Sequence, residues 1–500
     1  MATDVQTFYK DKVVFLTGGS GFLGKVLIEK LLRTTKVKRI YVLLRTKNGQ
    51  DVQDRFATWE TDPVFLLLLQ SDPDVLKRVA PLAGDCQAPD LGLSPSDRQL
   101  LLDEVQVVFH GAATVRFMEP LHIALAINTR AALLMMELAK EMQHLVAFVH
   151  VSTAFSNCVE KHIEERYYPE NLNRPVRKVL QLYETLDDEL VDNMTPVLLG
   201  KFPNTYTYTK ALAEQLLQNE AGDLPFCIFR PGAIIATYKE PMSGWIDNLY
   251  GPIAVLYGAA RGFIRITLLN VHAQAGIVPV DYCVNTMIVL AWDTARNALK
   301  AHHPDPPIYN FTPSERRPIT WGGFRDKAGK LKNTFPLNRM LWKPFLHCTR
   351  SMWLFKFLVY FYHLLPGYAI DMVLRLRGRK PRLIKLYDKI HKNIEVLSPF
   401  VDTSWKFDTN NTQHLWKQLS PDDQLLYEFD MSRLDWDDYF KRALAGLRIY
   451  LGKEDPGEDS LKRGRVLLRR FTILHSILQF VLFSGAFALL WSILKPLFSL

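Results

Sequence analysis

Short apolar runs alternate with helical patterns through the first part of the chain. Residues 13–16 form an apolar run of strand type, and from Phe22 onward apolar side chains recur every three or four residues, as on one face of a helix. Further strand-like runs lie at residues 39–44, 78–82, 105–109, 146–151 and 227–230. This alternation of strands and helices predicts an α/β fold with a doubly wound parallel sheet.

The alternating pattern is interrupted once and later stops. Residues 160–200 are charged and helical in pattern, and we interpret them as an insertion over the functional site. Strand alternation ends near residue 330, so residues 1–330 are predicted to form the first domain. Residues 340–450 are rich in Trp, Phe, Tyr, Leu and basic side chains, which predicts a mostly helical second domain. Residues 451–470 are charged and contain a Pro-Gly pair, as is typical of a linker.

The last apolar segment is long enough to cross a membrane. As a helix, residues 471–494 would extend about 36 Å, more than a bilayer core of about 30 Å. Basic residues precede it, and the polar N-terminus lacks a signal-peptide pattern, so the flank and the first domain are expected in the cytosol. These features predict a C-terminal transmembrane tail anchor; a buried hairpin of core helices is the alternative. The basic residues are Lys462, Arg463, Arg465, Arg469 and Arg470.

Residues 352–374 form a second apolar stretch. Lys356, Pro366 and Asp371 interrupt it. These interruptions favour an interfacial or core helix over a second membrane span.

Composition narrows the classes of function. With 500 residues, 48% of them hydrophobic and 23% charged, the chain is an ordinary folded protein of two or three structural units. The net charge of +9 fits an anionic membrane surface or an anionic substrate or cofactor. No zinc-finger spacing or long basic arm is present, so nucleic acid is not expected as a partner. The five cysteines are far apart without a C-x-x-C pair, which disfavours disulfides and a metal site.

A glycine-rich turn follows the first strand and opens the first helix. In G-x-x-G-x-x-G the first glycine permits the tight turn, the second lets the backbone approach a pyrophosphate, and the third lets the helix pack closely. The helix N-terminus then presents free N–H groups to the phosphates. This context predicts a Rossmann-type nicotinamide-cofactor site. Its expected residues are Thr17, Gly18, Gly21, Phe22, Leu23 and Gly24.

The end of the second strand indicates which cofactor is bound. NAD enzymes commonly carry an acidic residue there for the ribose 2′-hydroxyl, whereas this chain has Arg45. A guanidinium suits a 2′-phosphate, so NADPH is favoured over NADH; an exposed arginine without a cofactor role is the alternative. Asp85 follows the third strand, where it could reach the adenine, and Ala112 follows the fourth, where a small residue lets the backbone approach the cofactor.

Tyr206 and Lys210 have the spacing Y-x-x-x-K, which puts both side chains on one helix face. The lysine ammonium would lower the pKa of the phenol from about 10 and could hold the nicotinamide ribose. The pair predicts a carbonyl reductase in which Tyr206 donates a proton to the carbonyl oxygen. A hydroxyl from Thr153 or Ser152 would hydrogen-bond the developing oxyanion, with Thr153 favoured. Tyr208 would be the functional ring only with another lysine spacing.

Several motifs in one order resemble the fatty acyl-CoA reductases of the extended short-chain dehydrogenase/reductase superfamily. They are TGGSGFLGKVLIEKLLR, HGAATVRF, VHVSTAFSN, PNTYTYTKALAE and FRPGAII, and the region from about 350 to 450, with LLPGYAIDMVLRL, is similar to that family's C-terminal domain. By this resemblance Tyr206 and Lys210 are the active pair, Thr153 or Ser152 is the hydroxyl position, and Asn128 is a structural or proton-relay asparagine.

The resemblance implies a four-electron reduction. A long-chain fatty acyl-CoA would be reduced by two NADPH, through an aldehyde, to a primary fatty alcohol with release of CoA. Membrane lipid is the second expected partner, in the peroxisome or the endoplasmic reticulum. Two alternatives stay open: a reductase acting on a sterol or another lipid carbonyl, and a membrane-anchored scaffold that has lost catalysis.

Overall fold

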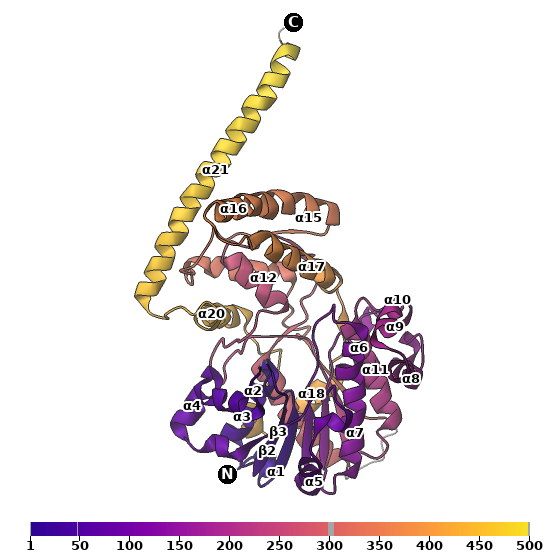
Figure 1. Ribbon diagram of the computed structural model, residues 1–500. Coiled ribbons are helices and arrows are strands. Elements are labelled where there is room, and N and C mark those ends of the chain that lie inside the picture. Colours follow the sequence, from indigo (N-terminus) through magenta and orange to yellow (C-terminus); the bar gives the residue numbers. More distant parts are fainter. Residues whose placement is uncertain (1, 48, 299–304, 499–500) are drawn as a thin grey trace. The chain divides into compact units, whose positions relative to one another are not determined.

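The computed structural model describes residues 2–47, 49–298 and 305–498 (Figure 1). Seven parallel strands form one sheet in the order β11-β7-β5-β4-β1-β2-β3. The order turns back between β1 and β4, and ligands of such sheets bind at the carboxyl ends of the strands beside this switch point. The predicted doubly wound sheet is confirmed, with strand ends shifted by one or two residues. The strands are β1 (Val13–Thr17), β2 (Arg39–Leu44), β3 (Val79–Ala83), β4 (Val107–His110), β5 (Ala147–Val151), β7 (Phe226–Pro231) and β11 (Ile308–Phe311).

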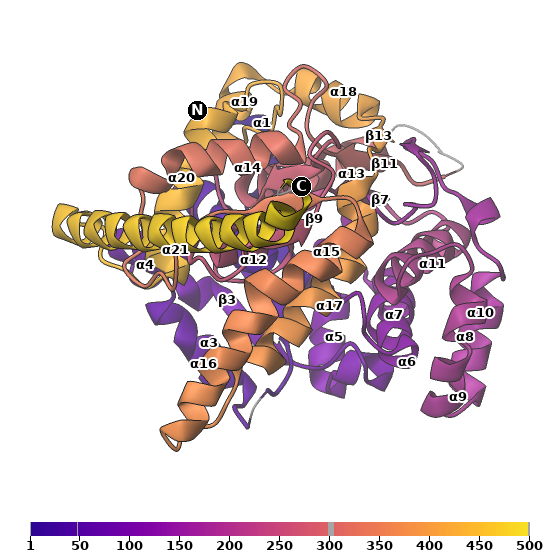
Figure 2. The same cartoon turned by 90° about the horizontal axis from the view of Figure 1, so that it is seen from above.

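Helices pack on both faces of the sheet (Figure 2). On one face α2 (Phe22–Thr34) packs against α13 (Val280–Ala298), which contacts β5 and β7. On the other face α7 (Ala131–Glu141) contacts β4 and packs against α11 (Thr205–Glu220). The start of α11 is fixed by Asn204, whose side chain accepts the N–H of Thr207 at 2.9 Å. This cap sets where Tyr206 stands on the helix.

The insertion at residues 160–200 lies outside the main sheet. It contains β6 (His162–Ile163), α8 (Val176–Thr185), α9 (Asp188–Asn193) and α10 (Thr195–Leu199). Strand β6 pairs in parallel with β13 (Lys406–Phe407), which comes from much later in the sequence. A strand pair with this separation is not visible in local hydropathy, because each partner has only two residues.

The chain forms two compact units, and each is built from several segments. The first unit holds Met1–Trp245, Gln274–Ile319 and Thr403–Trp436; the second holds Ile246–Ala273, Thr320–Asp402 and Asp437–Leu500. The sequence analysis instead places one boundary near residue 330. The first unit also contains α1 (Asp4–Tyr9), α3 (Val52–Ala57), α4 (Pro63–Ser71), α5 (Pro95–Glu104), α6 (Leu121–Ala124), α18 (Asn410–Gln418), α19 (Pro421–Leu426) and the paired strands β8 (Ala233–Ile235) and β10 (Ile277–Pro279).

The second unit is mostly helical, as predicted. A π-helical turn, Tyr360–Leu364, joins α15 (Met352–Val359) to α16 (Leu365–Leu376) without a break. The two helices therefore form one 25-residue rod, and α16 packs against α17 (Leu383–Asp402). The unit also contains α12 (Gly251–Ala260), α14 (Trp321–Lys330), α20 (Trp436–Gly446), α21 (Glu458–Phe498) and the paired strands β9 (Ile266–Leu268) and β12 (His347–Thr349).

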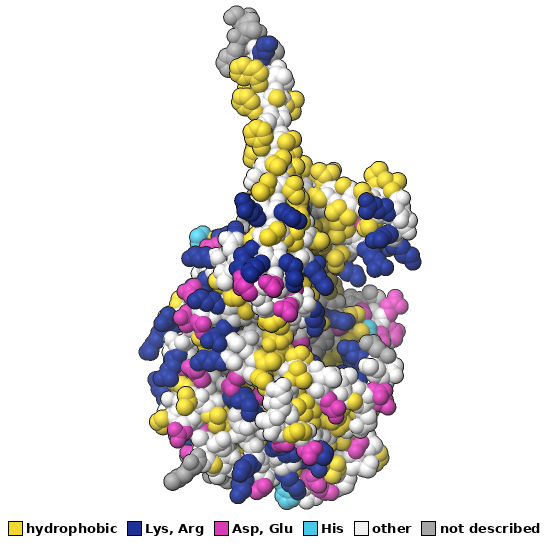
Figure 3. All heavy atoms as spheres, turned by 90° about the vertical axis from the view of Figure 1, so that its left-hand side faces the viewer, with side chains coloured by type: hydrophobic (Ala, Val, Ile, Leu, Met, Phe, Trp, Pro, Cys, Tyr) yellow, Lys and Arg dark blue, Asp and Glu magenta, His cyan; other side chains and the backbone are white. Residues whose placement is uncertain are grey.

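Helix α21 carries the predicted membrane anchor. It begins directly after Pro456 and Gly457, so residues 458–470, which the charge pattern assigns to a linker, are its first turns. No proline interrupts residues 458–495, and Leu, Lys, Arg and Glu are good helix formers, so nothing ends the helix there. Figure 3 shows hydrophobic side chains along α21 and Lys and Arg side chains around its beginning.

Within the described residues, three helices are long and apolar enough to cross a membrane. They differ in burial: the apolar window is 67% buried in Leu121–Glu141, 22% buried in Met352–Leu376 and 0% buried in Glu458–Lys495. The first is part of the sheet domain's core, whereas no residue in the apolar window of α21 is buried. This exposure makes α21 the candidate anchor.

Candidate active site

The glycine turn leaves no room for side chains. Gly18 has a φ of +79°, and a Cβ there would lie 2.8 Å from the Ala112 nitrogen. A Cβ on Gly24 would lie 2.4 Å from the Gly18 carbonyl oxygen. Gly21, the residue before α2, donates its N–H to the Gly18 carbonyl at 3.0 Å. The turn therefore holds the N-terminus of α2 against the ends of β1 and β4, as a pyrophosphate site requires.

The other residues expected at this turn have distinct surroundings. The Thr17 hydroxyl accepts the N–H of Ala112 at 3.2 Å and lies 2.7 Å from His110 Nδ1, so it ties β1 to β4. Phe22 stacks on Trp245 with ring centroids 5.2 Å apart, and Leu23 is half-buried in the first turn of α2. Thr17 thus stabilises the glycine turn by joining the ends of the two strands next to it.

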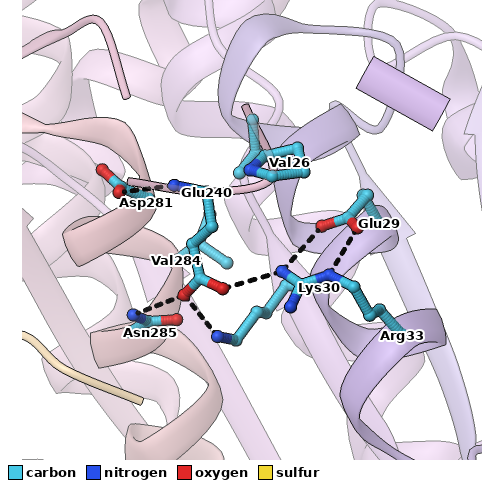
Figure 4. Close-up of a pocket in the computed structure, with 9 residues that line it drawn as sticks. Val26, Glu29, Lys30, Arg33, Glu240, Asp281, Val284 and Asn285 are labelled. Atoms are coloured by element: carbon cyan, nitrogen blue, oxygen red, sulfur yellow. Dashed lines mark hydrogen bonds and ion pairs between the residues drawn. The ribbon is translucent and has the colours of Figure 1, made fainter. Parts of the chain in front are cut away.

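A charged cluster holds the loop that carries Trp245. Figure 4 shows Glu240 of this loop reaching Lys30 on α2 and Asn285 on α13, and the Asp281 carboxylate accepting backbone N–H groups of the loop. Lys30 also donates to the Leu426 carbonyl at 2.6 Å. Burial lowers the pKa of Lys30 despite its carboxylate partner. The cluster fastens the loop to the first cofactor helix.

Arg45 and Asp85 meet at the carboxyl ends of β2 and β3. Their side chains are 3.8 Å apart and about half-exposed. Arg55, on α3, donates to the Arg45 carbonyl oxygen and, at 3.1 Å, to Ser20 Oγ in the glycine turn. Burial and the neighbouring Arg45 lower the pKa of Arg55. The sequence analysis missed Arg55, because only the packing of α3 brings it back to the turn.

Tyr206, Thr153 and Lys210 come together beside β5. The Thr153 hydroxyl hydrogen-bonds the Tyr206 phenol, and Lys210 Nζ donates to the Val151 carbonyl at 2.8 Å. Burial raises the pKa of Tyr206 to about 12, although the Thr153 hydrogen bond works in the opposite direction. Burial also lowers the pKa of Lys210 to about 8. Burial therefore determines the protonation state of the Tyr206 phenol, and not the Lys210 ammonium, which the sequence pattern led us to expect.

Ser152 has a different role from its neighbour. Its hydroxyl donates to the carboxylate of Glu214, which also forms an ion pair with Arg230 at 2.6 Å, both side chains being almost fully buried. Arg230 further donates to the carbonyl oxygens of Glu164 and Arg166. The structure thus separates Thr153, which contacts the phenol, from Ser152, which belongs to a buried ionic network.

Glu214 is a site residue that the sequence analysis missed. It stands four residues after Lys210 and eight after Tyr206, so the three side chains follow one face of α11. Its carboxylate raises the pKa of both Tyr206 and Lys210. The four-residue spacing from Lys210 would have been enough to predict from the sequence that Glu214 lies on the same face of the helix.

Two further residues lie apart from the reacting groups. Asn128, in a π-helical segment, accepts the N–H of Thr114 at 2.9 Å and donates to Thr209 Oγ1 at 3.0 Å, so it holds the loop after β4. Tyr208 is buried and packs against Phe202 with ring centroids 5.6 Å apart. Tyr206 is therefore the ring that faces Thr153.

Two buried histidines lie beneath the lysine. His110 and His150 occupy paired positions on β4 and β5, and their rings are 5.3 Å apart. Burial and the Lys210 charge lower both pKa values, that of His110 to about 3, so both rings are neutral. Among the residues that the structure describes, no group of three His, Cys, Asp or Glu side chains is placed to hold a metal ion.

Comparisons with known proteins agree with this architecture. Residues 16–287 match an NAD-binding family model described as "Male sterility protein", and residues 362–454 match a second model with the same description. The chain is 41% identical over 493 residues to "Fatty acyl-CoA reductase wat" of Drosophila melanogaster, covering 98% of this chain and 93% of that one. It is 35% identical over 490 residues to "Fatty acyl-CoA reductase 2" of Homo sapiens, covering 97% and 93%.

Solved structures support the fold. The reductase domain of a nonribosomal peptide synthetase from Mycobacterium tuberculosis is similar with a TM-score of 0.57 at 18% identity, covering 90% of this chain and 95% of that one. The terminal R domain of the myxalamid pathway is similar with a TM-score of 0.55 at 20% identity, covering 90% and 93%. A nicotinamide cofactor fits both the family model and the glycine turn.

Proposed function

The chain belongs to the fatty acyl-CoA reductase family, and on that premise we propose that it reduces long-chain fatty acyl-CoA to primary fatty alcohols with NADPH and release of CoA. The observation that carries the proposal is the Tyr206 phenol beside Thr153, one helical turn from Lys210, whose Nζ donates to the Val151 carbonyl at 2.8 Å just before that threonine. This group lies at the carboxyl edge of the sheet, where the glycine turn also ends. The arrangement suits proton donation to a carbonyl oxygen beside a nicotinamide.

The cofactor site fits a dinucleotide. Side chains on Gly18 or Gly24 would collide with backbone, so these positions keep a surface that a pyrophosphate can approach. Asp85 would contact the adenine and Lys210 the nicotinamide ribose. When bound, NADPH supplies one hydride in each of two reductions, so that acyl-CoA, two NADPH and two protons give the alcohol, CoA and two NADP⁺.

Tyr206 would donate and accept the protons of the reaction, and Thr153 would hydrogen-bond the same oxygen. With a pKa of about 12, Tyr206 is protonated at neutral pH and can donate to the thioester oxygen as the negative charge develops. Breaking the C–S bond of the hemithioacetal requires that this proton be withdrawn while the carbonyl re-forms, and Tyr206 is placed to take it back. Thr153 supplies the second hydrogen bond to the same oxygen. Tyr206 then donates again as the aldehyde becomes the alcohol.

Two guanidinium groups support NADPH over NADH. Arg45 follows β2, and Arg55 links the Arg45 backbone to Ser20 in the glycine turn. A 2′-phosphate would neutralise both charges, whereas a 2′-hydroxyl would not. We expect Arg45→Glu to raise the KM for NADPH much more than that for NADH. Equal effects on the two cofactors would contradict the assignment.

The proposed reaction is tested by its products. Purified full-length protein with palmitoyl-CoA or stearoyl-CoA should consume two NADPH and release one CoA thiol for each fatty alcohol detected by mass spectrometry. Tyr206→Phe should abolish alcohol formation and spare NADPH binding, while Tyr208→Phe, a little over half a turn away on α11, should keep most of the activity. Turnover of a sterol or other lipid carbonyl without thiol release would refute the acyl-CoA assignment. Absence of turnover with all acyl-CoA chain lengths would refute it as well.

The membrane location follows from α21. We propose that residues 471–494 span the bilayer as a tail anchor and that the basic turns before them stay on the cytosolic side. An anchor of this kind keeps the reductase where acyl chains and fatty alcohols partition. Protease protection and organelle imaging of the full chain would distinguish peroxisome from endoplasmic reticulum.

A further inference from the structure

The rod formed by α15 and α16 has two unlike faces. Every fourth residue from Phe355 is buried, in the series Phe355, Val359, His363, Gly367 and Asp371. The opposite stripe is apolar and exposed: Trp353 is 75% exposed and Leu376 is 78% exposed. The rest of the exposed stripe consists of Phe357, Tyr360, Phe361, Leu365, Tyr368 and Met372.

The inner face is fixed by specific contacts. Phe355 and Val359 pack in one cluster with Ile266, Leu268 and Ile394. His363 accepts the backbone N–H of Arg265 at 2.9 Å and is hydrogen-bonded to His391 at 2.8 Å. The Asp371 carboxylate accepts three backbone N–H groups at the start of α17. The rod cannot rotate to hide its outer stripe without losing all of these bonds.

Positive charge surrounds the end of the rod. Residues 352–392 contain nine Lys or Arg and two Asp, and one of these, Asp371, faces inward. Arg375, Arg377, Arg379, Lys380 and Lys385 are all exposed. An apolar stripe with Trp and Tyr, bordered by long basic side chains, matches the chemistry of a membrane interface with anionic headgroups.

The rod is also connected to the anchor helix. The Phe345 ring lies 5.6 Å from Tyr362 in the rod and 5.2 Å from His475 in α21. Trp342 Nε1 is hydrogen-bonded to His475 Nδ1 at 3.1 Å. His475 lies one helical turn after the start of the apolar part of α21. A bilayer into which α21 inserts at this level would therefore also contact the rod.

We propose that the α15–α16 rod lies in the surface of the same bilayer that α21 enters, with its apolar stripe among the acyl chains and its basic end on anionic phospholipid headgroups. This monotopic contact is separate from the proposed reaction. A spanning rod would bring Lys356 and Arg375 into hydrocarbon and would break the Asp371 contacts with α17. A rod at the interface leaves Lys356 and Arg375 in contact with water and keeps the hydrogen bonds of Asp371.

The experiment measures depth in the membrane for the full chain. The protein is placed in nanodiscs of phosphatidylcholine with phosphatidylserine, and an environment-sensitive fluorescent amino acid replaces Trp353. Lipids carry a nitroxide quencher either near the headgroup or near the end of the acyl chain. Probes at Phe487 in α21 and at Leu425, which is 84% exposed in the first unit, serve as the inserted and the non-inserted reference.

We expect the probe at position 353 to be quenched mainly by the shallow nitroxide, the probe at 487 by the deep one, and the probe at 425 by neither. Joint reversal by Arg377→Glu, Arg379→Glu and Lys380→Glu should cause loss of shallow quenching at 353, while Lys77→Glu, on an exposed surface elsewhere, should not. Retained alcohol formation and an unchanged circular dichroism spectrum would show that the variants are folded.

Three results would overturn the proposal. Quenching at 353 no greater than at 425 would mean that the stripe does not contact lipid, and a doubled particle mass in that case would assign it to a second copy of the chain. A steady change from shallow to deep quenching along positions 353, 361, 368 and 376 would mean that the rod spans the bilayer. Shallow quenching that is equally strong in pure phosphatidylcholine would refute the role of anionic lipid.

Discussion

Replacing Glu214 by Gln should both destabilise the first unit and shift the pH dependence of catalysis. Glu214→Gln keeps the shape of the side chain but removes the charge that faces Arg230, whose own side chain is 0% exposed. Arg230 keeps its bonds to two backbone carbonyls, yet its positive charge loses its carboxylate. The same substitution removes the negative charge that acts on Lys210 and replaces one of the two carboxylate oxygens, which accept from Ser152 and Arg230, by an NH2 group that cannot accept.

The size of the stability effect follows from burial. Breaking a buried pair by neutralising one partner typically costs roughly 3–5 kcal/mol, a large share of the free energy of unfolding of a domain. A matched surface change should cost far less: Glu141 pairs with Arg98 at 2.7 Å, but the two side chains are 51% and 32% exposed. Glu141→Gln is therefore expected to cost about 0–1 kcal/mol.

The catalytic effect has a definite sign. Lys210 has a pKa of about 8 instead of 10.5 because burial disfavours its charge, and the Glu214 carboxylate raises that pKa. Removing the carboxylate lowers the pKa further, so Lys210 loses its proton at lower pH. The alkaline fall of kcat/KM should move to lower pH in Glu214→Gln and stay in place in Glu141→Gln.

Two measurements test this reasoning. Denaturant unfolding of the full chain in detergent micelles, followed by tryptophan fluorescence, gives the stability difference between the two variants. A pH series of kcat/KM with an acyl-CoA gives the position of the alkaline limb. Equal stability of both variants, or an alkaline limb that does not move, would refute the assigned role of Glu214.

Three further predictions concern the same site. Gly24→Ala should weaken NADPH binding by roughly 5- to 100-fold in a fluorescence titration, because the new Cβ would lie 2.4 Å from a backbone oxygen, whereas Gly329→Ala, with nothing within 4 Å, should bind normally. Thr153→Val should lower kcat by about 100-fold with little change in melting temperature, and Ser152→Ala should do the reverse; equal kcat losses would contradict the separation of the two hydroxyls. In the unmodified chain kcat/KM should fall as pH rises past about 8, because Lys210 deprotonates, and a flat profile to pH 10 would contradict its cationic role.

The sheet could be predicted from sequence because each strand carries its own signal. Residues 13–16 and 39–44 are apolar and β-branched, and the turn between them and the following helix has a glycine pattern with a known geometry. The division into units could not be predicted. It depends on β6 and β13, two-residue strands more than 200 positions apart, and no local pattern reports such a pair.

The common helix face of the proposed catalytic pair could be predicted for a similar reason. Tyr206 and Lys210 are one helical turn apart, so sequence spacing fixes their common face. The choice between Thr153 and Ser152 needed the positions of Glu214 and Tyr206 relative to the residues that follow β5. The position of Arg55 beside the glycine turn could not be predicted from the sequence. Helix α3 is short, and only packing determines its direction relative to that turn.

The π-helical turn at Tyr360–Leu364 has a consequence for insertions and deletions in this part of the chain. In a regular α-helix, each step of four residues overshoots a full turn by about 40°, so a series of five such positions drifts by about 160°. The wider turn takes up an additional residue, which offsets about 100° of this drift and keeps the buried positions of α16 close to the buried face of α15. Removing one residue from it would leave a regular α-helix, and Asp371 would still face α17, because the shorter segment and the loss of the wider turn cancel. The turn is therefore a place where this rod can lose one residue and still keep its apolar stripe on the outer face.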